Sequence, residues 1–393
     1  MHSAGHEADT GTSRRAFLGR AAAGGATLAV AGTTGTGVAQ AAGRRKPAKP
    51  YRETARIDVH GHYLAPAYRA ALAAQGITTA IGGIPLPSWT PELALRFMDA
   101  EGIAVQMLSI SDPGVAFLAD DAAAAALART CNDYAASVVA AHPKRFGAFA
   151  VVPLRDVAAA TAEAVRALDQ LELDGVGLLS SADGAYLGDP RFEPLLAALD
   201  ARGAWVFVHP TAIGDDDKPS FSIPDFVAEY PFDTTRTIIS LLFNDAFARY
   251  PRIRWHFAHG GGTVPMLRSR LTVLAGNAKQ FGAIIGLPPR SAALNAKSAN
   301  KALAGCHYDT ALIADPPELA AVSSMASTDR LLFGSDWPFA WRYYGPAQNE
   351  YPKKVNDPQP VLSDAFSADV RHDIDRRNAR RQFKRLASAV PKG

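Results

Sequence analysis

Eight short apolar runs, separated by segments with helical periodicity, are the feature that most restricts the folds open to this chain. The runs are rich in β-branched and aromatic residues and close to continuously apolar, which is typical of parallel strands buried on both faces. They cover residues 55–60, 105–111, 146–153, 175–180, 205–209, 253–259, 307–312 and 331–335. Eight such strands over roughly 280 residues predict an α/β fold, a (β/α)8 TIM barrel.

The segments between the strands favour this barrel over its main alternative. Helical patterns cover residues 91–101, 122–142, 157–172, 192–202, 234–250 and 316–325, and a last helix with a solvated basic face is predicted over 363–388. Residues 78–88 and 282–304 interrupt the alternation as insertions that could cover the pocket or form subunit contacts. An open doubly wound sheet would carry a glycine-rich phosphate-binding turn after its first strand. That position holds His60-Gly61-His62 instead.

Four of the predicted strands end in histidine or aspartate. His60 and His62 follow the first strand on one face, because side chains two residues apart in a strand point the same way. His209 ends the fifth strand, His259 ends the sixth, and Asp336 follows the eighth. A barrel gathers these strand ends at one face. Imidazole and carboxylate groups bind zinc, and bind manganese or iron when oxygen donors dominate, so the sequence predicts a metal site there.

The remaining histidines and both cysteines are predicted to be structural. His142, His256, His307 and His372 do not lie at such strand ends, and His256 is expected to be a packed or hydrogen-bonded strand residue. Cys131 and Cys306 form neither a disulfide framework nor a CxxC pair, so both are expected to be buried small side chains.

The charge of the chain gives little support for binding to nucleic acid. The net charge is +3 over 393 residues, and no run of lysine and arginine is interleaved with aromatic residues. A hydrophobic content of 48% and a charged content of 20% are ordinary for a globular protein. We therefore expect a small-molecule enzyme rather than a nucleic-acid or membrane protein.

The N-terminal residues have the pattern of an export signal. Arg14 and Arg15 form a twin-arginine motif, a weakly apolar run extends over 21–38, and Ala39-Gln40-Ala41 resembles a cleavage site. The run is too rich in glycine and threonine for a membrane span. We predict a signal peptide at 1–42, a linker at 43–54 and the barrel with its C-terminal helix at 55–390. The expected location is periplasmic or extracellular.

Several motifs resemble those of the amidohydrolase superfamily, and the resemblance covers nearly the whole chain after residue 55. They are IDVHGH (57–62), WTPELALRFMDAEGI (89–103), VHP (208–210), HGGGTVP (259–265) and FGSDWPF (333–339). Within the superfamily they are similar to the branch of aminocarboxymuconate-semialdehyde decarboxylases and metal-dependent benzoate-type decarboxylases. Residues 86–114, with LSISDPG, are most like 6-methylsalicylate decarboxylases.

This resemblance implies a role for each candidate residue. His259 would not bind the metal but would orient or deprotonate a metal-bound group. Arg270 would grip the substrate carboxylate, sometimes from a neighbouring subunit, and the branch is often dimeric, so we expect a homodimer. The implied ligands of one divalent ion, zinc with manganese as the alternative, are His60, His62, His209 and Asp336.

Two departures from relatives refine this expectation. Residues 175–181 contain no lysine to bridge two metals, which implies a mononuclear site. Residues 78–88 contain no arginine, although the muconate-semialdehyde enzymes carry a second substrate arginine there. A monocarboxylate aromatic acid is therefore expected rather than a dicarboxylate.

The motifs favour decarboxylation, with Asp336 as the group that passes a proton to the ring carbon. A metal-dependent hydrolase of an amide or lactone would use the same residues, with His259 or Asp336 as base, and export mildly favours it. A non-catalytic metal-binding barrel is the third possibility, against which His259 and Asp336 both argue. Carbon dioxide release from hydroxybenzoates separates the first two.

Overall fold

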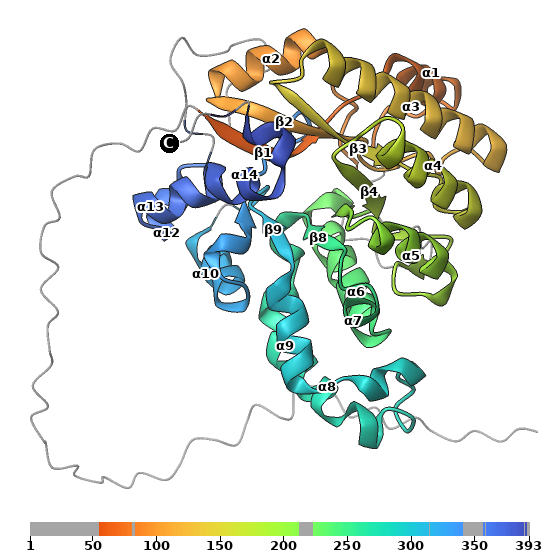
Figure 1. The fold of residues 1–393 in the computed structure, drawn as a ribbon, viewed down its shortest axis with the longest axis vertical. Helices are drawn as coiled ribbons and strands as arrows, with labels where there is room; N and C mark the ends of the chain where they lie inside the picture. Colours follow the sequence, from red (N-terminus) through yellow and green to blue (C-terminus); the bar gives the residue numbers. More distant parts are fainter. Residues whose placement is uncertain are drawn as a thin grey trace, which may run out of the picture. The chain divides into compact units, whose positions relative to one another are not determined.

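The strands of the protein follow one another in chain order around a parallel barrel (Figure 1). The structure is a computed structural model of the chain, and it describes residues 55–80, 83–211, 223–313, 315–340, 357, 359–388 and 390. The eight strands of the ring are β1 (Arg56–His62), β2 (Ile103–Ser109), β3 (Phe146–Val151), β4 (Gly175–Leu179), β7 (Trp205–His209), β8 (Arg254–Phe257), β9 (His307–Asp309) and β10 (Leu331–Leu332). The predicted signal peptide and linker lie outside the described residues.

The ring closes between β1 and the residues that follow β10. The backbone N–H of His62 donates to the carbonyl oxygen of Trp337 at 2.7 Å, and that of Asp336 donates to the carbonyl oxygen of His60 at 2.7 Å. Gly61 and Trp337 form a parallel bridge. The predicted (β/α)8 barrel is therefore confirmed, and its closing seam carries candidate metal ligands on both sides.

Helices pack on the outside of these strands, as the contacts of α2 with β2 and of α3 with β3 show. A short antiparallel pair, β5 (Ser181–Ala182) and β6 (Ala185–Tyr186), follows β4. The helices up to β10 are α1 (Pro66–Ala74), α2 (Pro91–Ala100), α3 (Asp121–Ala141), α4 (Val157–Asp169), α5 (Glu193–Ala201), α6 (Glu229–Phe243), α7 (Ala246–Arg249), α8 (Val264–Phe281), α9 (Ala296–Gly305) and α10 (Pro316–Met325).

Two predictions were wrong in detail before β10, and two helices were missed. The predicted helix over 234–250 is divided into α6 and α7, because Asp245 has a left-handed φ of 59°. Helices α1 and α8 were not predicted at all. The insertion predicted at 282–304 contains most of α9, which packs on α8 and begins with a capping box formed by Asn295 and Ser298.

The C-terminal segment is a series of short turns rather than one continuous helix. It comprises α12 (Val361–Ala365), α13 (Ala368–His372), a π-helical turn (Asp373–Arg377), α14 (Asn378–Gln382) and α15 (Lys384–Ala387). Arg371 and Arg376 within it are buried, so the prediction of a wholly solvated basic face was wrong for these two residues.

This segment covers the end of the barrel remote from the candidate site. Phe383 packs against Trp205 of β7, with ring centroids 4.7 Å apart, and against Phe149 of β3 at 6.1 Å. The same inner cluster contains Ile57 and Val59 of β1. Burial of these apolar groups stabilises the floor of the barrel, and polar residues gather at its opposite end. Among the described residues, no helix is both long and apolar enough to span a bilayer.

Candidate metal centre

Three histidines and one aspartate bring their donor atoms together at the C-terminal ends of barrel strands. His60 and His62 belong to the end of β1, His209 ends β7, and Asp336 follows β10. Their potential ligand atoms all lie within 4.8 Å of one another, and all four side chains are buried. Nε2 of His62 is 3.1 Å from Nε2 of His60 and 3.0 Å from Oδ1 of Asp336. The structure therefore assembles the four residues that the sequence proposed as ligands.

The outer ring nitrogens of two ligands face groups that can only accept a hydrogen bond. Nδ1 of His60 is 2.9 Å from Oδ2 of Asp309, and Nδ1 of His209 is 2.8 Å from the carbonyl oxygen of Pro210. Carboxylate and carbonyl oxygens do not donate, so we infer that both imidazoles carry their proton on Nδ1. Each then presents an unprotonated Nε2.

The third imidazole is held in the same way by a hydroxyl group. Ser109 donates its hydroxyl proton to the carbonyl oxygen of Gly61 at 3.1 Å, so its oxygen accepts from Nδ1 of His62 at 2.9 Å. Three unprotonated nitrogens and a carboxylate oxygen then converge. Separations of 3.0–3.1 Å between neighbouring donors suit one ion bonded to each at about 2.0–2.2 Å. The donor set therefore fits a single divalent cation.

Burial and neighbouring charges keep these groups in their metal-binding forms. Burial lowers the pKa of His60, and burial together with the adjacent imidazoles lowers the pKa of His209 well below its ordinary value. Burial alone raises the pKa of Asp336, but His259 and the ligand imidazoles outweigh it and hold that pKa well below its usual range. Neutral imidazoles and an ionised carboxylate are the forms that bind metal.

A second buried carboxylate, Asp58 in β1, ties the two sides of the closing seam together. Its oxygens accept from Nε2 of Gln106 at 2.8 Å and from the hydroxyl and backbone N–H of Ser335 at 2.6 and 2.9 Å. It also accepts from the backbone N–H of His60 at 3.1 Å. Burial raises the pKa of Asp58 to about 6. Asp58 thus connects the strand that carries His60 to the segment that carries Asp336.

His259 lies beside the ligand group and also faces a cavity. It begins a short turn (His259–Gly261) directly after β8, and its Nε2 is 3.5 Å from Oδ2 of Asp336. Beyond this approach, neither of its ring nitrogens has a hydrogen-bond partner among the described residues. Its cavity is also lined by Thr263, Met266 and Ile313. His259 is therefore placed to exchange a proton with Asp336, while its role stays a prediction.

Arg270 is not part of this group within one chain. It lies on the exposed side of α8 and lines a groove with Val273, Phe281 and Ile285. None of the four candidate ligands lines that groove. A substrate contact from Arg270 would therefore have to come from another subunit, and this role also stays a prediction.

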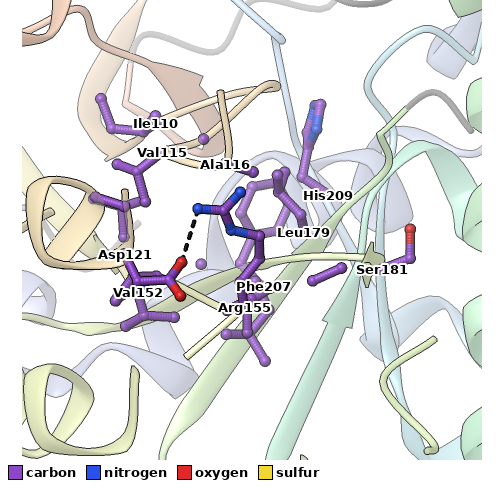
Figure 2. Close-up of a pocket in the computed structure, with 18 residues that line it drawn as sticks. Ile110, Val115, Ala116, Asp121, Val152, Arg155, Leu179, Ser181, Phe207 and His209 are labelled. Carbon is purple, nitrogen blue, oxygen red and sulfur yellow. Dashed lines mark hydrogen bonds and ion pairs between the residues drawn. The ribbon is translucent and has the colours of Figure 1, made fainter. Parts of the chain in front are cut away.

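A pocket with mainly apolar walls adjoins His209. Figure 2 shows Ile110, Val115, Val152 and Leu179 around it. These residues come from the ends of β2, β3 and β4 and the loops that follow them. At its outer end, Arg155 pairs with Asp121 at 2.7 Å and also donates to the carbonyl oxygens of Leu118 and Ala119. The pocket therefore offers an apolar surface next to the metal ligands.

The sequence did not identify the residues that hold the ligands in place. Asp309 and Ser109 fix two imidazoles, and Asp58 and Gln106 support the seam. The rule that found the ligands could have found Asp309, because it ends β9 as His209 ends β7. Asp309 and Ser109 are distant in sequence from the histidines that they contact, so these contacts cannot be predicted before the fold is known.

A (β/α)8 barrel with three histidines and an aspartate at its strand ends is an arrangement in which barrel enzymes can hold a divalent metal. Residues 57–385 match the model of the amidohydrolase family, so the chain belongs to that family. The family resemblance expected from the motifs is therefore confirmed.

Curated relatives of the chain include decarboxylases. A 6-methylsalicylic acid decarboxylase of Penicillium expansum is 35% identical over 289 residues, which cover 73% of this chain and 86% of the relative. A 6-methylsalicylic acid decarboxylase of Aspergillus aculeatus is 34% identical over 346 residues, which cover 86% and 99%. The 5-carboxyvanillate decarboxylase of Novosphingobium aromaticivorans, solved with manganese and 4-hydroxy-3-methoxy-5-nitrobenzoic acid, shares the fold. It has a TM-score of 0.67 and 20% identity, with coverage of 84% of this chain and 96% of that one.

Proposed function

We propose that the protein is a metal-dependent decarboxylase that releases carbon dioxide from a small aromatic carboxylic acid of the 6-methylsalicylate type. The observation that carries this proposal is the similarity to two 6-methylsalicylic acid decarboxylases at 34–35% identity over most of both chains. The convergence of three imidazoles and a carboxylate supports it. These relatives favour the decarboxylase over the hydrolase that the residues alone left open.

His60, His62, His209 and Asp336 would hold the metal, which we propose to be zinc, with manganese as the alternative. Three nitrogen donors and one oxygen donor suit both ions, and manganese is present in the structure of the carboxyvanillate decarboxylase. When bound, a divalent ion would supply positive charge at these residues, which would attract the substrate carboxylate and an ortho hydroxyl and would polarise the ring. Metal dependence is part of this proposal.

The protein's own residues then have one main task, which is to deliver a proton. Loss of carbon dioxide from the arene carboxylate leaves an electron pair on the ring carbon, and one proton must bind there to give the arene. Oδ2 of Asp336 lies 3.5 Å from Nε2 of His259. A proton carried by His259 and Asp336 can reach the ring carbon from a buried position. We therefore assign delivery of the proton to these two residues.

The surroundings of the site favour an aromatic monocarboxylate. The cavity that His259 faces has mainly apolar walls, which include Met266, Leu312 and Ile313, and an aromatic ring can pack against them. Residues 78–88 contain no arginine for a second carboxylate. Among the described residues that line the pocket beside His209, the guanidinium of Arg155 is paired with Asp121.

The deciding experiment measures products and not merely substrate loss. Protein stripped of metal is reloaded with zinc or with manganese and incubated with 6-methylsalicylate, salicylate and 2,6-dihydroxybenzoate. We expect metal-dependent release of carbon dioxide in equal amount to the phenolic product, which is 3-methylphenol from 6-methylsalicylate. Turnover of lactones or amides without carbon dioxide would instead establish the hydrolase, and a metal-loaded protein inert toward both panels would contradict either enzyme.

We also propose that the protein acts as a homodimer in which α8 lies at the interface. Exposed apolar side chains follow this helix and the turn after it, with exposed fractions between 42% and 78%: Met266, Val273, Phe281, Ile284 and Ile285. Val273, Phe281 and Ile285 line one groove, and exposed apolar side chains gathered in this way mark interaction surfaces. Arg270 lies among these residues, where it could enter the site of the second subunit.

Export by the twin-arginine route remains a proposal that rests on Arg14, Arg15 and the run that follows them. This route carries folded proteins, so the buried metal site could be filled before transport. Replacing both arginines by lysine should retain the protein in the cytoplasm of a bacterial host, as cell fractionation would show.

A further inference from the structure

Asp309, which ends β9, is a fully buried carboxylate in contact with both halves of the candidate site. Its Oδ2 lies 2.9 Å from Nδ1 of His60 and 2.9 Å from Nε2 of His256. Its Oδ1 accepts from the backbone N–H of His259 at 3.0 Å and from that of Ala311 at 3.1 Å. One side chain therefore touches a metal ligand, a buried histidine and the backbone of the proposed proton carrier.

Every group around this carboxylate is a donor. The indole N–H of Trp205 donates to Nδ1 of His256 at 3.4 Å, which assigns the proton of His256 to Nε2, toward Asp309. The two backbone groups can only donate. An ionised carboxylate has about four acceptor positions, and four N–H groups fill them. A neutral amide or a protonated acid at this place would put a donor against a donor.

The consequence for His60 is a single allowed tautomer. With Nδ1–H directed at Asp309, its Nε2 is unprotonated and lies 3.1 Å from Nε2 of His62. If the proton moved to Nε2, the lone pair that must bind metal would be lost. Carboxylate–histidine–metal arrangements of this kind orient the ring and raise its basicity as a ligand.

The other oxygen of Asp309 fixes the backbone where His259 departs from β8. His259 has a left-handed φ of 53°, a conformation that is unfavourable for a side chain of this size without outside support. The hydrogen bond from its N–H to Oδ1 supplies such support. The position of the His259 ring thus depends on the same carboxylate as the tautomer of His60.

We propose that Asp309 is a positioning residue that couples the metal ligand His60 to the proton carrier His259, by holding the first in its metal-binding tautomer and the second in its backbone conformation. This inference rests on the proposed function only in that the four ligands bind an ion. It does not depend on which bond the enzyme breaks.

The test compares two substitutions that each replace a buried carboxylate by its isosteric amide. In Asp309→Asn the amide must either turn its NH2 toward the backbone N–H groups or force His60 into the other tautomer. Glu163→Gln is the control, because Glu163 in α4 is also buried and accepts from Nδ2 of Asn132 and from Nε and Nη2 of Arg166, while none of these partners belongs to the candidate metal site. Zinc affinity is measured by competition with a chromophoric chelator, and stability by unfolding of the metal-free protein.

We expect Asp309→Asn to weaken zinc binding about 10–100-fold, and Glu163→Gln to weaken it far less at a similar loss of stability. Equal effects on zinc affinity in the two variants would reduce Asp309 to a structural residue and overturn the proposal. A wild-type protein that binds zinc but releases no carbon dioxide would contradict the proposed function while leaving this inference intact.

A second measurement needs no variant and so holds even if Asp309→Asn does not fold. In metal-free wild-type protein labelled with 15N at histidine, long-range 1H–15N spectra distinguish the two neutral imidazole tautomers. We expect His60 to carry its proton on Nδ1, with assignment from the signal lost in His60→Gln. A His60 protonated on Nε2 would overturn the proposal.

Discussion

The four candidate ligands and His259 lie close together, but the ring nitrogens of the histidines have different surroundings. The imidazole of His62 is held at Nδ1 by Ser109 and presents Nε2 to the ligand group. His259 has no such partner among the described residues. A ligand and a proton carrier should therefore respond differently when each is truncated.

This difference predicts a separation of metal content from rate. His62→Ala should lose metal and activity together, because one of four donors disappears. His259→Ala should retain one metal ion per chain but lose about 10²–10⁴-fold in kcat, the usual contribution of a general acid or base. Metal content is measured by mass spectrometry of the desalted protein beside steady-state rates. Stoichiometric metal in His62→Ala, or none in His259→Ala, would contradict the assignments.

A second prediction at this scale concerns His307, which is buried in β9 beside Trp205 and Arg330. Burial, and then the positive charge of Arg330, lower the pKa of His307 from 6.5 to about 3. In the unfolded chain His307 therefore binds a proton below about pH 6.5, whereas in the folded protein it binds one only below about pH 3. Stability from this group is complete above pH 6.5 and decreases as the pH falls below it.

The measurement is the unfolding free energy of the metal-free protein at pH 7 and pH 5, with His307→Phe as the comparison. The wild type should lose about 2 kcal/mol more than the variant over this interval, from a slope of about 1.4 kcal/mol per pH unit below pH 6.5. Parallel curves for the two proteins would show that His307 does not titrate in this way.

At the scale of single residues, the strand-end rule grouped the four candidate ligands with His259 because it depends only on where apolar runs stop. The family resemblance then separated His259 from the candidate ligands. The strand-end rule did not predict the partners of these residues. Asp309 is 249 positions from His60, and no local pattern indicates which of several buried acids will meet which imidazole. Ser109 likewise resembles an ordinary strand residue until β2 is placed beside β1.

At the scale of elements, the turn between β8 and α8 controls where His259 lies. Gly262 in this turn has a φ of 63°, and a Cβ atom there would collide with the backbone carbonyl oxygen of Pro231 in α6. Gly286, in the loop after α8, has a similar φ of 75°, but a Cβ atom there would meet no other group within 4 Å. Gly262 also has a ψ of −130°, close to a backbone region that only glycine adopts readily, and it lacks the space for a side chain that Gly286 has.

Alanine substitutions at these two glycines should therefore have unequal effects. Gly286→Ala should lose about 1–2 kcal/mol of stability, the strain of a left-handed residue. Gly262→Ala should lose about 1–3 kcal/mol more, since the added methyl group is overpacked against backbone, and zinc-loaded enzyme should also lose rate because His259 is displaced. Urea unfolding measures the first effect. Equal losses of stability in the two variants would mean that α6 moves away from the added methyl group at no cost in free energy.

The elements themselves were predictable where periodicity was strong and unpredictable where it was weak. The eight strands emerged because both of their faces are buried. Helix α8 was missed because it exposes apolar side chains such as Met266 and Val273, which blur an amphipathic pattern. The C-terminal helix was over-extended because its charged residues suggested a solvated face, whereas Arg371 lies buried with Asp375.

At the scale of the whole molecule, the exposed apolar surface of α8 and the location of Arg270 point to one arrangement. If two copies pack through α8, the side chain of each Arg270 can extend from its own groove toward the candidate site of the other subunit. Burial of the apolar side chains would then stabilise the dimer. Activity would require the dimer, because each site would need Arg270 from the other subunit. Val273→Asp should therefore yield monomers in analytical ultracentrifugation, while Phe232→Asp, at an exposed apolar position on α6, should leave the dimer intact.

Mixed dimers test whether Arg270 acts across the interface. Arg270→Ala and His259→Ala chains, carrying different affinity tags, are co-expressed and the mixed dimer is purified through both tags. If the arginine comes from the partner, the Arg270→Ala chain keeps its own His259 and receives an intact Arg270, so one of the two sites works and about half of the wild-type kcat returns. If Arg270 acts within its own chain, both sites of the mixed dimer stay defective, and its rate is no higher than the mean of the two parent dimers.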